Sequence, residues 1–344
     1  MPIPNSGVVP GSGAIYNELT SVTRRAFMPT VTVQIYYSTP TLMMLMRNAQ
    51  RSAGGLSQIT GPVQGNSMVQ GSWASYSGNF NRPTVIPGLQ NFQFNTSYFL
   101  VPVPLVLGEA LLQSTEAVIP ILDVRMNDVK AVMVQQMGSA LFTNNTANNL
   151  MPSSFFDAFD NGTNVTSYGG ISRTAAGNSF WKGQYYGAAG AVLTRKAMAA
   201  YLIQVTDVAG GEAPDFVVMS PSDYATLQQD FIGVEQQYIN PGPMSNPTIG
   251  SLDTAVRSAF PNLVINGVPF FMDHWCPKGT LYMINSKYTS MYLSEDAPFA
   301  FSGFYSGIPL FQIAQVGVAI VGYQVITTKP ISGAKITGIT GGAF

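Results

Sequence analysis

One long stretch of the sequence, residues 114–142, repeats its apolar side chains with the period of an α-helix. Spacings of three and four place these side chains in one stripe along the helix; they are Ile119, Leu122, Met126, Val129, Met133 and Met137. The residues between them are polar, so we expect a surface helix that spans about 40 Å. Pro120 is tolerated only near a first turn, so the regular helix begins late or bends there. The open alternative is an ordinary helix of a mixed globular domain.

The composition of the chain is unusual for a free monomer. Only 10% of its 344 residues are charged and 46% are hydrophobic, whereas roughly 25% of a typical soluble domain is charged. Such a surface would be poorly soluble alone, which suggests that copies of the chain cover one another. Membrane insertion is the competing explanation, but the sequence has no run of about 18 apolar residues. No basic segment followed by an apolar one opens the chain, so we infer no secretion signal.

The charge is unevenly distributed along the sequence. Before Gly108, five arginines and one glutamate give +4, and the total of −1 leaves −5 for the rest. Opposite net charges favour contact between parts of neighbouring copies, and the alternative is that the arginines face a polyanion. The arginines are Arg24, Arg25, Arg47, Arg51 and Arg82.

The first 95 residues are expected to depend on partners for their order. Residues 1–41 are rich in Pro, with one predicted strand at Thr30–Tyr37, and a short helix follows at 41–50. This arm cannot build its own core, so it is disordered or is ordered by lying across other subunits. Residues 55–95 alternate in short stretches between Gly and Pro, which indicates a long twisted hairpin. Its aromatic residues favour docking on a partner; they are Trp73, Tyr76, Phe80 and Phe92.

The rest of the chain predicts a mixed α/β lobe. A strand at 97–107 leads into the long helix, an irregular segment follows to 184, and a second helix lies within 187–208. A buried strand at 215–219 is followed by a helix that Ser220 caps, with Pro221 at its first position. A helix at 252–260, strands within 263–293, a β-rich stretch at 299–327 and a Gly-rich tail from 332 complete the prediction.

The sequence offers few residues for catalysis. His274 and Cys276 are the only residues of their kinds, and a metal needs three or four ligands while a nucleophile needs an orienting third group. We therefore expect a turn between strands there. Asp157 and Asp160 are expected to lie in a solvated loop. No phosphate-binding loop, dinucleotide fingerprint or HExxH motif appears, so we expect no enzyme, no cofactor and no metal.

The order of these elements resembles that of the major capsid proteins of tailed phages, which have the Hong Kong 97 coat fold. Three stretches carry the resemblance. Gly169–Arg173 with Asn178–Gly183 is similar to the family's GGI(D/S)R…(F/W)W segment, and Asp215–Tyr224 to its strand-to-helix step. Residues 276–288, CPKGTLYMINSKY, resemble its CPxGTLYxxNxKY pattern.

The resemblance implies an α+β fold and a structural function. The expected parts are an N-terminal arm (1–54), an extended β-hairpin loop (55–95), a peripheral domain with the spine helix (96–189), an axial domain (190–298), and return strands with a C-terminal tail (299–344). Copies would form the hexamers and pentamers of an icosahedral shell, assembled in the host cytoplasm, that encloses double-stranded DNA in the virion. The alternative is the shell of an encapsulin-like nanocompartment.

The resemblance also implies contacts and partners. The loop residues Trp73, Tyr76, Phe80, Arg82 and Phe92 would touch a neighbouring subunit, and Arg24, Arg25, Arg47 and Arg51 would make arm contacts or face DNA. A portal and a decoration protein are further expected partners, with no membrane. Some family members crosslink a loop lysine, but residues 55–108 contain no lysine, so we expect no such crosslink. The arm is too short for a built-in scaffolding segment, so we expect a separate scaffolding protein.

Overall fold

The computed structural model describes most of the chain, and its contacts divide the chain into two compact units. The described residues are 39–52, 58–65, 67–68, 73, 76, 88–106, 121–145, 150–238, 263–295, 297, 299–306 and 314–340. Unit 1 comprises residues 1–37, 98–136 and 296–322, and unit 2 comprises 38–97, 137–295 and 323–344. The predicted boundaries of the peripheral and axial domains stay a prediction.

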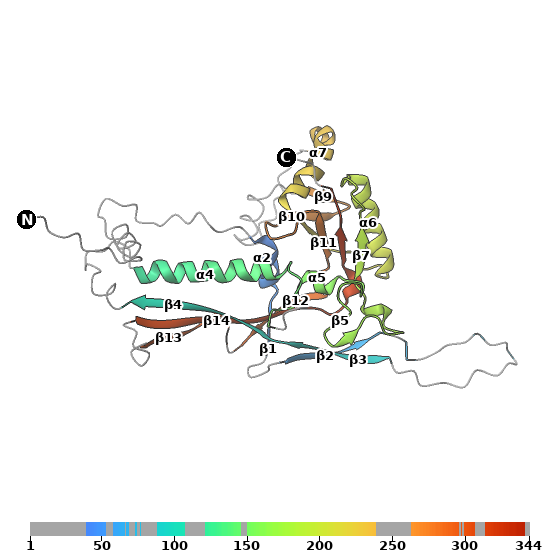
Figure 1. The fold of residues 1–344 in the computed structure, drawn as a ribbon. Helices are drawn as coiled ribbons and strands as arrows, with labels where there is room; N and C mark the ends of the chain where they lie inside the picture. Colours follow the sequence, from blue (N-terminus) through green and yellow to red (C-terminus); the bar gives the residue numbers. More distant parts are fainter. Residues whose placement is uncertain are drawn as a thin grey trace, which may run out of the picture. The chain divides into compact units, whose positions relative to one another are not determined.

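Unit 1 contains most of the long helix and most of three strands that have no charged residue. Strands β4 (Ser97–Val106) and β13 (Ala300–Ser306) both pair with β14 (Ala314–Thr327). Helix α4 (Ile121–Ala140) runs beside β4 (Figure 1), and the Arg125 side chain donates to the carbonyl oxygen of Pro104 at 2.9 Å. The helix predicted at 114–142 is confirmed over these residues, beginning directly after Pro120 and ending two residues early. Residues 107–120 lie outside the described part of the chain.

The apolar stripe of α4 follows the predicted spacing. Val129, Met133 and Met137 are buried, as the three- and four-residue repeat requires. Gln135 is buried too, although the sequence pattern places it on the polar face.

Unit 2 is built around a six-stranded sheet in the order β7-β15-β11-β8-β10-β9. Its strands are Gln184–Gly187, Ala334–Thr337, Thr280–Ile284, Phe216–Met219, Val268–Met272 and Leu263–Ile265, in that order. Helices α6 (Arg195–Val208) and α7 (Pro221–Tyr238), labelled in Figure 1, contribute side chains to the core that packs against this sheet. That core includes Leu202, Val205, Val217, Met219, Leu281 and Met283.

Capping side chains mark the first residues of these helices. The predicted Ser220 cap of α7 is confirmed, because its hydroxyl accepts a hydrogen bond from the Asp223 backbone N–H at 3.2 Å. The helix runs to Tyr238, beyond the predicted end near 231. Thr194 caps α6 in the same way through the Ala197 N–H. The helix predicted at 252–260 lies outside the described residues.

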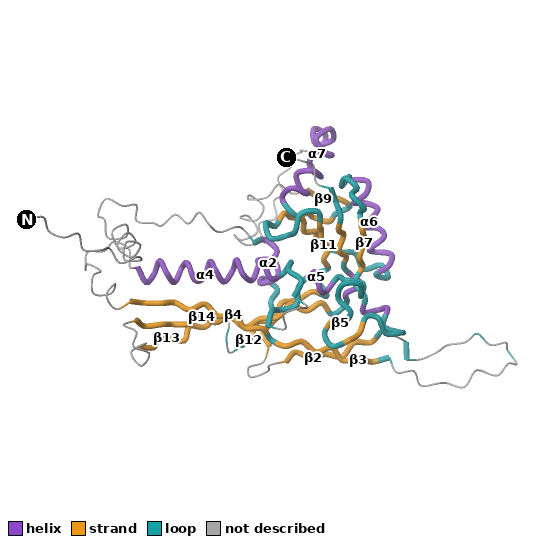
Figure 2. The backbone as a smooth tube through the Cα atoms, in the orientation of Figure 1, coloured by secondary structure: helices purple, strands orange, loops and turns teal. Residues whose placement is uncertain are grey.

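Smaller elements complete unit 2. Helix α2 (Pro40–Arg47) leads into β1 (Gln50–Ser52), which pairs in parallel with β12 (Thr289–Ser294). Strands β2 (Gln58–Gln64) and β3 (Leu89–Asn95) form an antiparallel pair (Figure 2), which confirms the predicted hairpin over these residues. The other short elements are α5 (Phe155–Ala158), β5 (Ser167–Tyr168), β6 (Ile171–Ser172), η1 (Ser179–Trp181) and η3 (Pro330–Ser332).

Two sequence-based expectations were wrong. The Gly-rich tail expected from residue 332 contains β15, an interior strand of the six-stranded sheet between β7 and β11. The loop of Asp157 and Asp160 is not solvated, because these side chains are only 5% and 0% exposed. Both errors have the same physical cause, since partners distant in sequence bury these segments. None of the helices in the described part of the chain has the length and apolarity needed to span a membrane.

Candidate assembly surface and its anchor

The most exposed aromatic side chains of the described residues lie between β2 and β3. Trp73 and Tyr76 have relative exposures of 105% and 110%, so neither is covered by its own subunit. Large aromatic side chains in full contact with water are unfavourable alone and are typical anchors of protein interfaces. These two residues are therefore the strongest candidates for contact with another molecule.

The other predicted contact residues fall into three groups. Arg47 and Arg51 are exposed, at the end of α2 and in β1. Phe92 is only 7% exposed and is packed inside its own subunit, so little of it is left for a neighbour. The remaining ones, Phe80, Arg82, Arg24 and Arg25, lie outside the described residues.

The two strands that carry this loop are fixed to unit 2 by aromatic packing. The Phe92 ring stacks on Trp181 with centroids 6.1 Å apart and planes at 14°, and the Phe94 ring meets the edge of Tyr168 at 4.9 Å. The Gln93 backbone N–H donates to the carbonyl oxygen of Gly169 at 2.9 Å. The β2–β3 pair is thus a firmly seated root from which the loop departs.

Glycines make this close packing feasible. A Cβ on Gly169 would lie 2.6 Å from the Phe94 ring, and its φ of +56° is a left-handed conformation. That conformation costs a residue with a Cβ about 1–2 kcal/mol. Gly169 and Gly170 form the turn that joins β5 to β6.

A buried arginine supports the segments on which the β2–β3 pair packs. Arg173 is fully buried and donates to three carbonyl oxygens, those of Asp157 (2.6 Å), Ala158 (2.6 Å) and Trp181 (3.1 Å). Its guanidinium carbon lies 4.8 Å from the centroid of the Tyr168 ring. Burial lowers the pKa of Arg173 to about 10, although Tyr168 and the nearby carboxylates oppose the shift. The guanidinium thereby links three segments of the chain that are not paired with one another as strands of a sheet.

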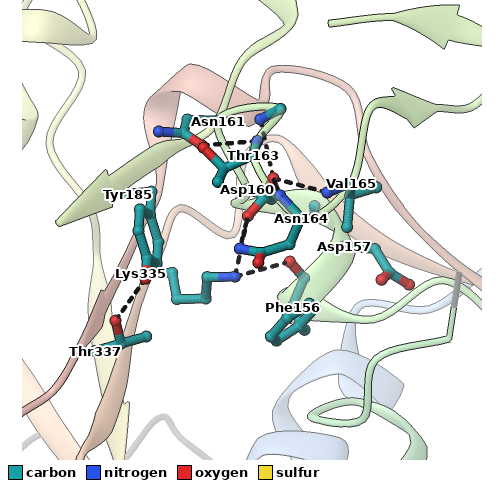
Figure 3. Close-up of polar contacts among 12 residues, drawn as sticks. Phe156, Asp157, Asp160, Asn161, Thr163, Asn164, Val165, Tyr185, Lys335 and Thr337 are labelled. Atoms are coloured by element: carbon teal, nitrogen blue, oxygen red, sulfur yellow. Dashed lines mark hydrogen bonds and ion pairs between the residues drawn. The ribbon is translucent and has the colours of Figure 1, made fainter. Parts of the chain in front are cut away.

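Asp160 and Lys335 form a buried ion pair (Figure 3). The Lys335 Nζ of β15 is 3.4 Å from Asp160 Oδ1, and both side chains are 0% exposed. The ammonium also lies 3.6 Å from the centroid of the Phe156 ring. Backbone N–H groups of Gly162, Asn164 and Val165 donate to Asp160 at 2.9–3.0 Å. A buried carboxylate with this many donors is well compensated.

The pKa values of the two neighbouring aspartates are shifted in opposite directions. Burial alone raises the pKa of Asp160, but the hydrogen bonds from Asn164, Val165 and Gly162 outweigh it and hold this pKa below its usual value. Burial raises the pKa of Asp157, and its hydrogen bonds with Ser154 only partly compensate. Burial likewise lowers the pKa of Lys335 against the opposing effect of Asp160. These groups hold segments of the fold together through their hydrogen bonds and ion pair.

His274 and Cys276 form the turn that the sequence predicted, between β10 and β11. Cys276 is 3% exposed, and burial, with Asp273 and Asp223 nearby, raises the pKa of its thiol well above the usual value. The thiolate is therefore disfavoured. Among the described residues no group of three His, Cys, Asp or Glu side chains is placed to hold a metal ion.

Sequence reasoning missed the residues that support the root. Arg173 and Trp181 were noted only within the segment that resembles the capsid family, without a role. Lys335 was assigned to the tail. Their partners are up to 175 residues away along the chain, so no local pattern signals them.

Comparison with known proteins supports the fold through structure alone. No protein-family model and no curated protein sequence matches the chain. The cyanophage A-1(L) capsid protein matches with a TM-score of 0.69 and 15% identity, over 92% of this chain and 97% of its own. The capsid of an empty GTA particle matches with a TM-score of 0.59 and 10% identity, over 97% and 99% of the two chains. The SrpI encapsulin from Synechococcus elongatus PCC 7942 matches with a TM-score of 0.50 and 10% identity, over 90% and 92%.

These likenesses cover 90–97% of the chain, which itself combines helices and sheets. The predicted α+β fold of the tailed-phage capsid proteins, the Hong Kong 97 coat fold, is therefore confirmed for this chain.

Proposed function

We propose that this chain is the major capsid protein of a tailed bacteriophage. Its copies form hexamers and pentamers, and these close into an icosahedral shell around double-stranded DNA. The observation that carries the proposal is the fold, shared with the cyanophage capsid protein at a TM-score of 0.69 over 92% of the chain. The function is structural and requires no catalysis.

The geometry of the β2–β3 root explains how one subunit would reach another. The root is held by stacked rings and by Arg173, while Trp73 and Tyr76 beyond it are uncovered. A preorganised support lowers the entropy lost when the exposed aromatic residues bind. Burial of these rings against a neighbouring copy would supply the interface with its anchors.

The low charge content fits the same function. Strands β4, β13 and β14 contain no charged residue, and Tyr98, Leu100 and Tyr305 of these strands are more than half exposed. Apolar side chains on an uncharged sheet favour burial against further copies. Arg47 and Arg51, together with Arg24 and Arg25, are proposed to make arm contacts or to face the DNA.

A second candidate function is the shell of a nanocompartment. It rests on the encapsulin likeness, whose TM-score of 0.50 is lower than the 0.69 of the cyanophage capsid. The phage function is therefore preferred. It places the protein in the virion after assembly in the host cytoplasm. A separate scaffolding protein, a portal and a decoration protein are the proposed partners.

Electron microscopy and light scattering of the expressed chain, with and without the products of neighbouring genes, test the proposal. Closed polyhedral shells or capsomer rings are expected. Shells that contain double-stranded DNA support the phage function, and shells filled with a protein cargo support the nanocompartment. A monomer under every condition would contradict both.

A further inference from the structure

A polar pocket lies beside β3 in unit 2. Its volume is about 480 Å³, which is within the range of pockets that hold small molecules. Among the described residues that line it, Asp157 is the only charged one. Amide and hydroxyl groups make up much of the remaining wall, and they include those of Gln93, Asn95, Asn145, Asn164, Ser167 and Gln324.

Two buried acceptor atoms in this wall have no hydrogen-bond partner among the described residues. They are Oδ1 of Asn145 and Oδ1 of Asp157, and each of these residues is only 5% exposed. The two residues are neighbours, because the Asn145 backbone N–H is one of the groups that lower the pKa of Asp157. A buried acceptor without a donor costs free energy, so these two atoms favour an occupant that brings its own donors.

The orientation of both side chains is set by their other hydrogen bonds. Asn145 Nδ2 donates to the carbonyl oxygens of Ala140 at 3.0 Å and of Pro152 at 2.6 Å. A flipped amide would place an oxygen against both carbonyl oxygens, so Oδ1 is the open atom. Asp157 Oδ2 accepts the Ser154 N–H at 3.3 Å, and Figure 3 shows the Asp157 carboxylate directed away from Lys335.

Donor groups of the wall are already used within the subunit. Gln324 Nε2 donates to the Asn95 carbonyl oxygen at 2.7 Å, and Asn164 Nδ2 donates to Asp160 Oδ1 at 2.8 Å. The guanidinium of Arg173 is close to Asp157, but it does not line the pocket and it donates to three backbone carbonyl oxygens. The pocket therefore offers open acceptors and one carboxylate, which suit a cation with several N–H groups.

We propose that this pocket binds the protonated amino group of a small aliphatic amine. An ammonium carries three donors and one positive charge, so it satisfies Asn145 Oδ1 and Asp157 Oδ1 together and offsets the charge of the carboxylate. Thr166 and Ser167 of the lining are exposed, which leaves the rest of the amine in contact with water. A divalent metal ion suits the site less, because it requires more charged ligands and the described residues place no three of His, Cys, Asp or Glu together.

Equilibrium dialysis of radiolabelled putrescine against the unassembled full chain tests the site. Asp157→Asn removes the charge and keeps the shape of the side chain, and Thr166→Lys places an ammonium of the chain itself at the pocket, where it competes with the amine. The matched controls are Asp207→Asn and Thr163→Lys, which make the same changes at exposed positions outside the lining. Unlabelled ethylamine, tetramethylammonium and 1,4-butanediol are added in turn as competitors.

The expected result is one saturable site per chain, at least about tenfold weaker in Asp157→Asn and Thr166→Lys and unchanged in the controls. Ethylamine should displace the label, whereas tetramethylammonium, a cation without N–H donors, and butanediol, a donor without charge, should not. If circular dichroism shows that Asp157→Asn is unfolded, Thr166→Lys decides alone. The inference is overturned if no saturable binding occurs, if the folded variants bind as the wild type does, or if tetramethylammonium competes as well as ethylamine. Because binding is measured without assembly, each of these outcomes leaves the proposed function standing.

Discussion

Replacement of Arg173 by leucine tests whether a buried guanidinium holds the root of the loop in place. The substitution leaves three buried carbonyl oxygens without their donor, at about 2 kcal/mol each and thus about 6 kcal/mol in all. It also removes the cost of burying the charge. The lowering of the pKa of Arg173 to about 10 corresponds to about 3 kcal/mol. The expected net loss of unfolding free energy is therefore about 3 kcal/mol.

Urea unfolding of the unassembled full chain, followed by circular dichroism, measures this loss. Arg173→Lys keeps the charge but not the three-way donation, so it should fall between the wild type and Arg173→Leu. Arg51→Leu is the matched control, because Arg51 is exposed and its loss should change the free energy by less than about 0.5 kcal/mol. Hydrogen exchange at the β2 and β3 amides should quicken in Arg173→Leu alone. Equal midpoints for Arg173→Leu and the wild type would refute the reasoning.

Three further substitutions test other parts of the fold and of the surface. Asp160→Asn should destabilise the subunit at pH 7 and progressively less below pH about 4, because a carboxylate whose pKa is lowered by folding stabilises the folded state only above the pKa that it has in the unfolded chain. Urea midpoints of the variant and the wild type at pH 7, 5 and 3 measure this. A difference in unfolding free energy that stays constant with pH would contradict it. Gly183→Ala would place a Cβ 2.4 Å from the Phe159 backbone and should cost several kcal/mol or solubility, whereas Gly187→Ala, which meets nothing within 4 Å, should be tolerated. Trp73→Ala should reduce particle yield without changing the melting temperature of the unassembled subunit, and normal yields of equally stable particles would count against the loop contact.

Elements with a sustained period could be predicted from the sequence. The stripe of α4 was correct at Val129, Met133 and Met137, because burial of one helix face is a local pattern repeated over several turns. The Ser220 cap and the hairpin strands were correct for the same reason, since caps and alternation are written in adjacent residues. Expected positions that lie outside the described residues stay predictions.

The burial of Lys335 and Asp160 could not be predicted from the sequence, because the partners that make it possible are distant along the chain. Lys335 belongs to a four-residue strand, too short for a period, and a lysine there suggests a surface position. It is buried only because Asp160, 175 residues away, supplies the counter-charge. The same pairing explains why a solvated loop was wrongly expected at Asp157 and Asp160. A sequence pattern indicates the environment that a type of residue usually has, whereas the burial of these residues depends on specific partners.

Buried charged side chains bind backbone groups where the chain forms little regular secondary structure. Arg173 binds three backbone carbonyl oxygens and Asp160 accepts three backbone N–H groups, so two side chains satisfy six main-chain groups in a segment with only short strands and turns. Because Phe92 stacks on Trp181, whose carbonyl oxygen Arg173 binds, the direction of the loop depends on these interior bonds. The strength of the proposed subunit contact is therefore set in part by residues that never reach the surface.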